Sequence, residues 1–312
     1  MTRPEGPSGP LGGMDVARAA QLACLLEASA RKPGNVSPGR HFADLRYEDF
    51  LAAAIAIGEP IAGAGQRPLG ATVRLAVEAT ARWTRSNTNL GIVLLLVPLA
   101  RAALRKSSSE GAPAAVSAFS MAGLRGALHH VLESTSVDDA REVYAAIRRA
   151  APGGLGKADA QDVANEPTKP LLDVMRLAAD RDGIAREYAT SFEVTFRTGA
   201  PALDRARRDG LSWEDAVVET FLTLLAAAPD THVARRGGAA LASAVLLRAR
   251  TVLAAGGVRS VAGRRVIDEM DLWLRDPRNT ANPGTTADLT AAAIFVVLLG
   301  GGWNGGHDAA TR

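Results

Sequence analysis

Two long apolar stretches, at residues 90–104 and 291–299, constrain the fold of this chain more than any other feature. Both are shorter than the roughly 18–20 apolar residues that a helix needs to cross a bilayer. Pro98 and Arg101 also interrupt the first of them. We therefore predict two buried helices in the core of a soluble protein.

Apolar residues recur at helical spacing along almost the whole chain, and no segment shows the alternation of a half-buried strand. We predict helices over residues 15–31, 47–61, 70–84, 89–106, 121–134, 137–150, 170–180, 184–198, 213–227, 233–254, 258–274 and 286–299. No linker and no repeat divides the chain. The expected fold is all-α, a single compact multi-helix domain with two buried apolar helices. Its predicted bounds are residues 14–303, between a disordered N-terminal tail at 1–13 and a flexible C-terminal tail at 304–312.

Composition excludes several classes of protein. Hydrophobic residues make up 47% of the chain and charged residues 22%, which is typical of a soluble globular protein. The 36 Lys and Arg against 33 Asp and Glu give a net charge of +3, and no basic run interleaved with aromatics supports nucleic-acid binding. Cys24 is the single cysteine, so no intramolecular disulfide can form. The first residues lack the apolar run of a signal peptide, and we predict a cytoplasmic protein without a nucleic-acid or membrane partner.

Three short segments place small residues, amides and one charge beside a helix end. They are residues 32–36 (KPGNV), 86–91 (SNTNLG) and 282–288 (NPGTTAD). Helix N-termini carry unpaired N–H groups and the positive end of a dipole, which suits phosphate. Three such ends in one domain predict a site for a polyphosphorylated ligand.

The first segment opens an irregular loop between two predicted helices. Lys32 and Arg40 are cations that can bind phosphate, while His41 and Asp44 can act in acid–base chemistry or bind a metal. Loops between stable helices often carry functional sites. The alternative is a solvated loop whose charges have no function.

The other two segments each precede an apolar helix. Asn87, Thr88 and Asn89 provide more polar groups than capping requires, so a ligand would explain the surplus, with ordinary capping as the alternative. Asp288 lies in the first turn of the last apolar helix, where a partly buried carboxylate needs a cation or strong donors. Mg²⁺ held by carboxylates and ligand phosphates is one candidate, and capping of the helix dipole is the alternative.

Two further loops combine charge with glycine. Residues 152–163 (PGGLGKADAQDV) contain Asp162 but lack the spacing of a P-loop or a dinucleotide-binding motif. Residues 230–238 (DTHVARRGG) bring Arg235 and Arg236 to a helix end. These arginines can clamp phosphate or remain solvated.

Taken in order, four of these segments resemble motifs of the triphosphoribosyl-dephospho-CoA synthase family. Residues 32–36 with His41 and Asp44 resemble its Pro-Lys-Pro-Gly loop, and residues 87–91 are similar to its Asn-Thr-His-Lys-Gly segment. Residues 230–238 resemble an Asp-Thr pair followed by Arg-Gly-Gly, and residues 282–289 resemble a terminal Asn-Pro-Gly-Gly-Ser-Ala-Asp-Leu motif. The resemblance extends over residues 15–300.

The resemblance implies an all-helical fold and a transferase with ATP as a substrate. In the family reaction, a ribose hydroxyl of 3′-dephospho-CoA attacks C1′ of ATP and adenine leaves, giving a precursor of an acyl-carrier prosthetic group. By this resemblance, Asp44, His41 and Asp162 are candidate catalytic residues, and Asp44 and Asp288 are candidate ligands of Mg²⁺. The residues expected to bind substrate phosphates are Lys32, Gly34, Asn35, Asn87, Thr88, Asn89, Arg236, Asn282 and Gly284.

One departure from the family motif removes a charge, because Asn89-Leu90 stand where the family carries His-Lys. This variant resembles a divergent branch found in archaea and in bacteria of one-carbon metabolism. It implies, as an alternative, an acceptor from the synthesis of methanofuran- or pterin-type cofactors. Two further hypotheses are an enzyme that hydrolyses the N-ribosyl bond and a non-catalytic nucleotide-binding helical protein.

Overall fold

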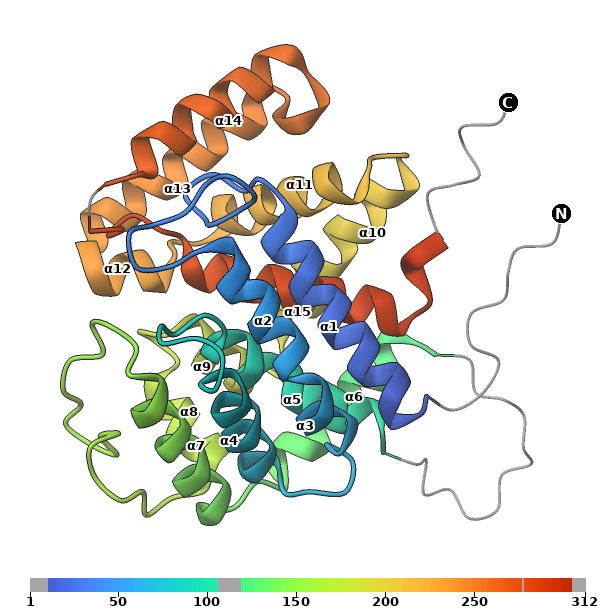
Figure 1. Cartoon of the computed structure of the whole chain (residues 1–312), viewed down its shortest axis with the longest axis vertical. Coiled ribbons are helices and arrows are strands. Elements are labelled where there is room, and N and C mark those ends of the chain that lie inside the picture. The colour runs from blue at the N-terminus through green and yellow to red at the C-terminus, as the bar shows by residue number, and fades with distance from the viewer. Residues whose placement is uncertain (1–10, 106–118, 277, 305–312) are drawn as a thin grey trace, which may run out of the picture.

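The computed structural model describes residues 11–105, 119–276 and 278–304, and these residues form helices and loops without a β-strand (Figure 1). The all-α prediction is confirmed. The first half contains α1 (Gly13–Ser29), α2 (Tyr47–Ala56), α3 (Gly58–Ala62), α4 (Leu69–Thr80), α5 (Leu90–Ala103), α6 (Met121–Glu133) and α7 (Val137–Ala150). The second half contains α8 (Leu171–Ala178), α9 (Gly183–Ala189), η1 (Thr195–Gly199), α10 (Ala200–Arg208), α11 (Trp213–Ala227), α12 (Thr231–Gly237), α13 (Ala239–Ala254), η2 (Gly257–Arg259), α14 (Val261–Leu274), α15 (Gly284–Leu299) and η3 (Gly302–Asn304).

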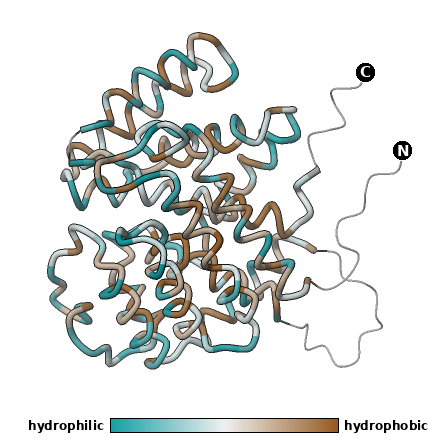
Figure 2. Tube along the Cα trace, viewed as in Figure 1, coloured by the Kyte–Doolittle hydropathy of each residue, from teal (hydrophilic) through white to brown (hydrophobic). Residues whose placement is uncertain are grey.

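The two apolar helices predicted from the sequence, α5 and α15, form the centre of the fold. α15 contacts α1, α5, α10 and α11, and most of its residues are buried. A helix that is apolar on every side has no face for solvent and must be enclosed in this way. Figure 2 shows the hydrophobic, brown parts of the chain gathered inside the fold.

Pro98 lies inside α5 without ending the helix. Because proline has no N–H, the carbonyl of Leu94 loses its usual helical partner. The hydroxyl of Tyr188 on α9 donates to that carbonyl at 2.7 Å, so a buried acceptor is satisfied by a side chain from another helix. This bond joins α5 to α9 beside the site described below.

Four predicted helices are divided in the structure. The one predicted at 184–198 breaks after α9, where Ser191 and Phe192 have positive φ, and the one at 258–274 breaks between η2 and α14.

The helix predicted at 47–61 breaks between α2 and α3, because Pro60 cannot donate to Ala56 and its ring would collide with that carbonyl. The helix predicted at 233–254 breaks at Gly238, whose φ of 88° and ψ of 163° belong to a region that only glycine adopts readily.

One helix, α10, lies where the sequence predicted none. Pro201 favoured a break in this region, but it falls in the first turn of α10, where a missing N–H is tolerated. The bulge of η1 directly precedes this turn.

The two predicted tails fall mainly outside the described residues. Residues 1–10 and 305–312 are not described, and the tail predictions for them stay untested. Leu11 packs against the core and Gly13 begins α1, so the helical part starts one residue before the predicted bound.

Ala239–Arg259 is the one described segment that is long and apolar enough to cross a membrane on length and hydropathy alone. It comprises α13 and η2. Its buried residues, Ala242, Val245, Ala249 and Val252 among them, belong to the main hydrophobic core, and α13 packs on α11 and α14.

The close contact of α4 with α7 depends on Gly70. A Cβ at this position would lie 2.4 Å from the carbonyl oxygen of Asp139 and 2.6 Å from its Cα. We expect Gly70→Ala to lower the free energy of unfolding by about 1–3 kcal/mol, because backbone must move to admit the methyl group. The measurement is urea denaturation followed by circular dichroism.

Gly126 on α6 provides the matched control, since nothing lies within 4 Å of a Cβ placed there. Gly126→Ala should raise the free energy of unfolding by about 0.5–1 kcal/mol through helix propensity. A stabilising effect of both substitutions would contradict the close packing of α4 on α7.

Candidate functional site

A cleft of about 1140 Å³ lies where the three segments singled out in the sequence meet. The end of α1 and the starts of α5 and α15 contribute to its wall, together with α8, α9, α12 and the loop that follows α7. In the view of Figure 1, α12 lies above α8 and α9. Residues far apart in the sequence, from Glu27 to Asp288, thus border one cavity.

Most of the predicted site residues line this cleft. Those that do are Asn35, Asp44, Asn87, Thr88, Asn89, Asp162, Arg236, Asn282, Gly284 and Asp288. Lys32, Gly34 and His41 are not in its wall. The cleft therefore brings together the polar segments that precede α5 and α15.

Lys32 is buried beneath the cleft wall instead of facing a ligand. Its side chain is 1% exposed, and its Nζ lies 3.0 Å from Oε1 of Glu27. Nζ also donates to the carbonyl oxygens of Glu27 and Ala30. An ammonium group has three donors, and these three partners occupy all of them. Lys32 therefore lies outside the cleft wall, and its ammonium group holds Glu27.

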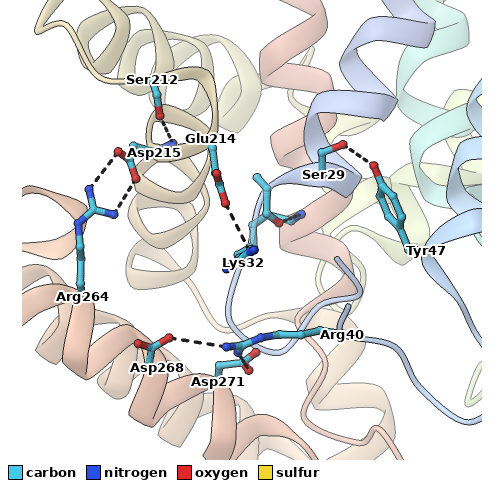
Figure 3. Close-up of polar contacts among 12 residues, drawn as sticks. Ser29, Lys32, Arg40, Tyr47, Ser212, Glu214, Asp215, Arg264, Asp268 and Asp271 are labelled. Carbon is cyan, nitrogen blue, oxygen red and sulfur yellow. Dashed lines mark hydrogen bonds and ion pairs between the residues drawn. The ribbon is translucent and has the colours of Figure 1, made fainter. Parts of the chain in front are cut away.

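The loop after Lys32 is fixed to α14. The N–H of Gly34, at φ 78°, donates to Oδ1 of Asp271 at 2.8 Å. Arg40 forms ion pairs with Asp268 and Asp271 of α14 (Figure 3). His41 is exposed on the same loop. Gly34 therefore supports the cleft from behind, and His41 lies outside its wall.

Amide side chains connect the walls of the cleft. Nδ2 of Asn35 donates to Oδ1 of Asn282 at 2.6 Å, and Oδ1 of Asn87 accepts from the N–H of Leu90 at 3.1 Å. Nδ2 of Asn89 donates to Oγ1 of Thr80 at 3.1 Å. The alternative of ordinary capping is thus present for Asn87, whereas Asn35 and Asn89 bridge to other side chains, which the sequence did not predict.

Three buried polar atoms in the wall have no hydrogen-bond partner among the described residues, and two of them are on side chains that are almost fully buried. These two are Oδ1 of Asn35 and Oγ1 of Thr88, both on side chains that are more than nine-tenths buried. Buried polar atoms in folded proteins nearly always have a partner, so each of these positions calls for one. A polar ligand in the cleft would supply it.

Asp230 ties α12 to α15 at the back of the cleft. Its carboxylate caps α12 by accepting from the N–H of Val233, and it also accepts from the N–H and hydroxyl of Thr286, both at 2.7 Å. Burial raises the pKa of this carboxyl. The hydroxyl of the adjacent Thr231 accepts from the N–H of Gly183, which adds the start of α9. These bonds hold the starts of three helices together.

Glu27 and Asp288 bring two carboxyl groups into the cleft wall. Glu27 is 3% exposed and pairs with Lys32. The carboxyl of Asp288 lies against α5 where only glycine leaves room, since a Cβ on Gly91 would be 2.0 Å from its Oδ2. Burial raises the pKa of Asp288 well above its ordinary value, and the nearby charge of Glu27 adds to this shift.

Arginines from several parts of the chain line the cleft. They are Arg85, Arg148, Arg181, Arg235, Arg236 and Arg278. Arg235 pairs with Asp182 at 3.3 Å, and Nη2 of Arg236 donates to the carbonyl of Arg278 at 2.7 Å. Guanidinium groups bind phosphate through paired hydrogen bonds, so this cluster can bind a polyphosphate.

His232 lies among these arginines and was not predicted as a site residue. Burial, followed by the charges of Arg235 and Arg236, lowers the pKa of His232 to about 4. Its imidazole is therefore neutral at pH 7, with a buried Nε2 that has no partner among the described residues. It offers a hydrogen bond to a ligand and no charge.

Asp44 and Asp162 both line the cleft, on different loops. Asp44 is exposed, and its carbonyl accepts from the hydroxyl of Ser86. The carboxylate of Asp162 accepts from the N–H groups of Ala158 and Ala164, and these bonds lower its pKa. Asp162 therefore organises its own loop as an ionised group.

Comparison with known proteins shows the family of the chain. The family described as ATP:dephospho-CoA triphosphoribosyl transferase (CitG) matches residues 13–306. A crystal structure from Archaeoglobus fulgidus, described as a triphosphoribosyl-dephospho-CoA synthase, superposes with a TM-score of 0.62 and 29% identity. The match covers 82% of this chain and 99% of the other.

Curated relatives match over a shorter region. A protein of Pseudomonas paraeruginosa, described as a 2-(5''-triphosphoribosyl)-3'-dephosphocoenzyme-A synthase, is 40% identical over 127 residues, which are 39% of this chain and 43% of the relative. A protein of Azotobacter vinelandii with the same description is 35% identical over 117 residues, 38% of this chain and 39% of the relative. The chain thus matches less than half the length of these relatives. Because the family match runs through nearly all the described residues, the chain belongs to the ATP:dephospho-CoA triphosphoribosyl transferase family.

Proposed function

We propose that the chain is a transferase that joins ATP to 3′-dephospho-CoA. An acceptor ribose hydroxyl forms a bond to C1′ of ATP, the bond from C1′ to adenine breaks, and adenine leaves. The observation that carries this proposal is the distribution of charge in the cleft. Exposed arginines such as Arg85 and Arg181 stand at its mouth, whereas the carboxyl groups of Glu27 and Asp288 lie deeper in its wall.

The size and charge of the cleft suit two nucleotide substrates. Its volume of about 1140 Å³ exceeds the range of roughly 300–1,000 Å³ that is usual for sites of drug-sized ligands. ATP carries a triphosphate and dephospho-CoA a diphosphate, and both anions match the arginines. Lys32, the cation beside Glu27, is already paired with it. The wall at Glu27 and Asp288 therefore offers phosphate less positive charge than the arginines do, which favours an orientation with the ribose of ATP toward these two residues.

The arginines also compensate for the cation that is missing at Leu90. Leu90 is buried in the cleft wall, and Asn89 is engaged with Thr80. Neither residue supplies charge to a triphosphate. Arg85 is five residues before Leu90 and lines the same cleft, so the positive charge comes from neighbouring positions.

In this proposal, Mg²⁺ binds to the protein together with ATP and neutralises part of the charge of the phosphates. Asp44 and Asp288 both line the cleft and are the candidate ligands for that ion, with Asp44 exposed on its loop and Asp288 half-buried. The described residues contain no group of three His, Cys, Asp or Glu side chains suited to hold a metal by themselves. A cytoplasmic location remains a prediction.

The proposed reaction is tested by incubating the purified chain with ATP, Mg²⁺ and 3′-dephospho-CoA and analysing the mixture by mass spectrometry. We expect free adenine and a triphosphoribosyl adduct in equal amounts. Adenine without adduct would indicate hydrolysis of the N-ribosyl bond instead. Absence of both products would contradict 3′-dephospho-CoA as the acceptor, and precursors of one-carbon cofactors would be the next acceptors.

Substitution of Arg181 tests whether the arginines of the cleft bind the phosphates of ATP. Arg181→Ala should raise the KM for ATP about tenfold and change kcat little, since one charge-assisted hydrogen bond contributes on the order of 1.5–3 kcal/mol at most. The control is Arg208→Ala on α10, a residue paired with Asp204 outside the cleft. An unchanged KM for ATP in Arg181→Ala would remove this arginine from the phosphate site.

A further inference from the structure

One side of the cleft is an apolar strip along α7 and α8, two helices that pack on each other beside the loop that joins them (Figure 1). The strip consists of Ile147 of α7 and Leu171, Val174, Met175, Leu177 and Ala178 of α8. The charged residues of α8, Asp173 and Arg176, pair with each other at 3.1 Å and do not border the cavity. A ligand that lies along this strip therefore meets no charge from α8.

Two leucines at this side of the cleft keep much of their surface open to solvent. Leu177 on α8 is 50% exposed, and Leu155 in the loop after α7 is 46% exposed. Single exposed apolar residues are common on any protein surface, but these two border the same cavity. Covering them with the apolar part of a ligand removes that surface from water, which favours binding.

The loop beside the strip adds hydrogen-bonding groups without charge. Residues 153–156 (GGLG) line the cleft, and no described residue accepts a hydrogen bond from their N–H groups. Nothing lies within 4 Å of a Cβ placed on Gly153 or on Gly156. Bare backbone of this kind allows a ligand to come close and to bond to the peptide groups.

The acceptor of the proposed reaction carries a group that matches this surface. 3′-Dephospho-CoA has a pantetheine arm on its diphosphate, an uncharged chain of apolar carbons with two amide groups and a terminal thiol. The lining residues extend along all of α8, which is about 12 Å long at a rise of roughly 1.5 Å per residue and so longer than a purine. Arg148 follows Ile147 and also borders the cleft, so a cation for the diphosphate stands beside the strip.

We infer that the apolar strip, together with Leu155, binds the pantetheine arm of the acceptor, and that Leu155 and Leu177 determine specificity for it. The inference rests on the proposed function. ATP has no such arm, so these two leucines select the acceptor and leave the donor unaffected. An acceptor without a long uncharged arm gains no affinity from them.

The test compares 3′-dephospho-CoA with the β-methyl ester of ADP, which keeps the adenosine, both phosphates and their charge but shortens the arm to one carbon. The Kd of each acceptor is measured by calorimetry, and kcat/KM by mass spectrometry of the adduct at saturating ATP. The proteins are the wild type, Leu177→Asp and Leu155→Asp. Leu247→Asp on α13 is the matched control, since Leu247 is 59% exposed and lies outside the cleft wall. Circular dichroism establishes that the variants are folded.

The wild type should prefer 3′-dephospho-CoA to the methyl ester by at least about 10²-fold in kcat/KM and in affinity, because each buried methylene group contributes about a fourfold factor. Leu177→Asp and Leu155→Asp should each lose about tenfold or more with 3′-dephospho-CoA, through KM and with little change in kcat. With the methyl ester, both variants should stay within about twofold of the wild type. The KM for ATP should not change, and Leu247→Asp should match the wild type throughout.

Equal affinity and equal kcat/KM of the wild type for the two acceptors would overturn the inference while leaving the transferase in place. Equal losses on both acceptors in the two leucine variants, or no loss on either, would also overturn it. A wild type that forms no adduct from 3′-dephospho-CoA would overturn the proposed function, and the assignment of the strip with it.

Discussion

The burial of α15 is the constraint on which the site depends. This helix has no polar face, so it can be stable only when other helices surround it. The first turn of α15 lies at the wall of the cleft, where the carboxylate of Asp230 accepts hydrogen bonds from Thr286. Asp288, in the first turn of α15, is thereby held half-buried beside Gly91. Burial raises the pKa of its carboxyl.

The rest of the site follows from the separation of charges. The arginines that line the cleft come from loops, from α7 and from the short helix α12, while the carboxyls of Glu27 and Asp288 come from the long helices α1 and α15. The donors of Lys32 are occupied by Glu27 and two carbonyl oxygens. In the proposed function, phosphate and ribose are thus drawn to different parts of one cavity.

The sequence predicted those parts of the fold that depend on local pattern. The apolar runs identified α5 and α15, and the polar residues before each run identified two walls of the cleft. The broken helices were harder, because Pro60 and Gly238 act through single backbone positions within otherwise helical segments. The helix α10 was not predicted, and Pro201 lies in its first turn, where a missing N–H is tolerated.

The site could be predicted only in part, because a charged residue that is buried pairs with another group of the protein instead of facing a ligand. Lys32 in a loop of small residues favours a phosphate ligand, yet its partner Glu27 lies on the apolar face of α1. Glu27 stands among Ala23, Cys24 and Ala28, and an acidic residue among these small apolar residues was the sequence signal for a buried ion pair. Arg181 and Arg278 carry no motif, and only the tertiary fold brings them together.

A crystal structure of Asp288→Asn with ATP and 3′-dephospho-CoA bound would test the central claim most directly. The account predicts that both nucleotides occupy the cleft, with their phosphates on the arginines and the ribose of ATP beside Glu27 and residue 288. Nucleotides bound elsewhere, or a triphosphate placed against Glu27, would contradict it.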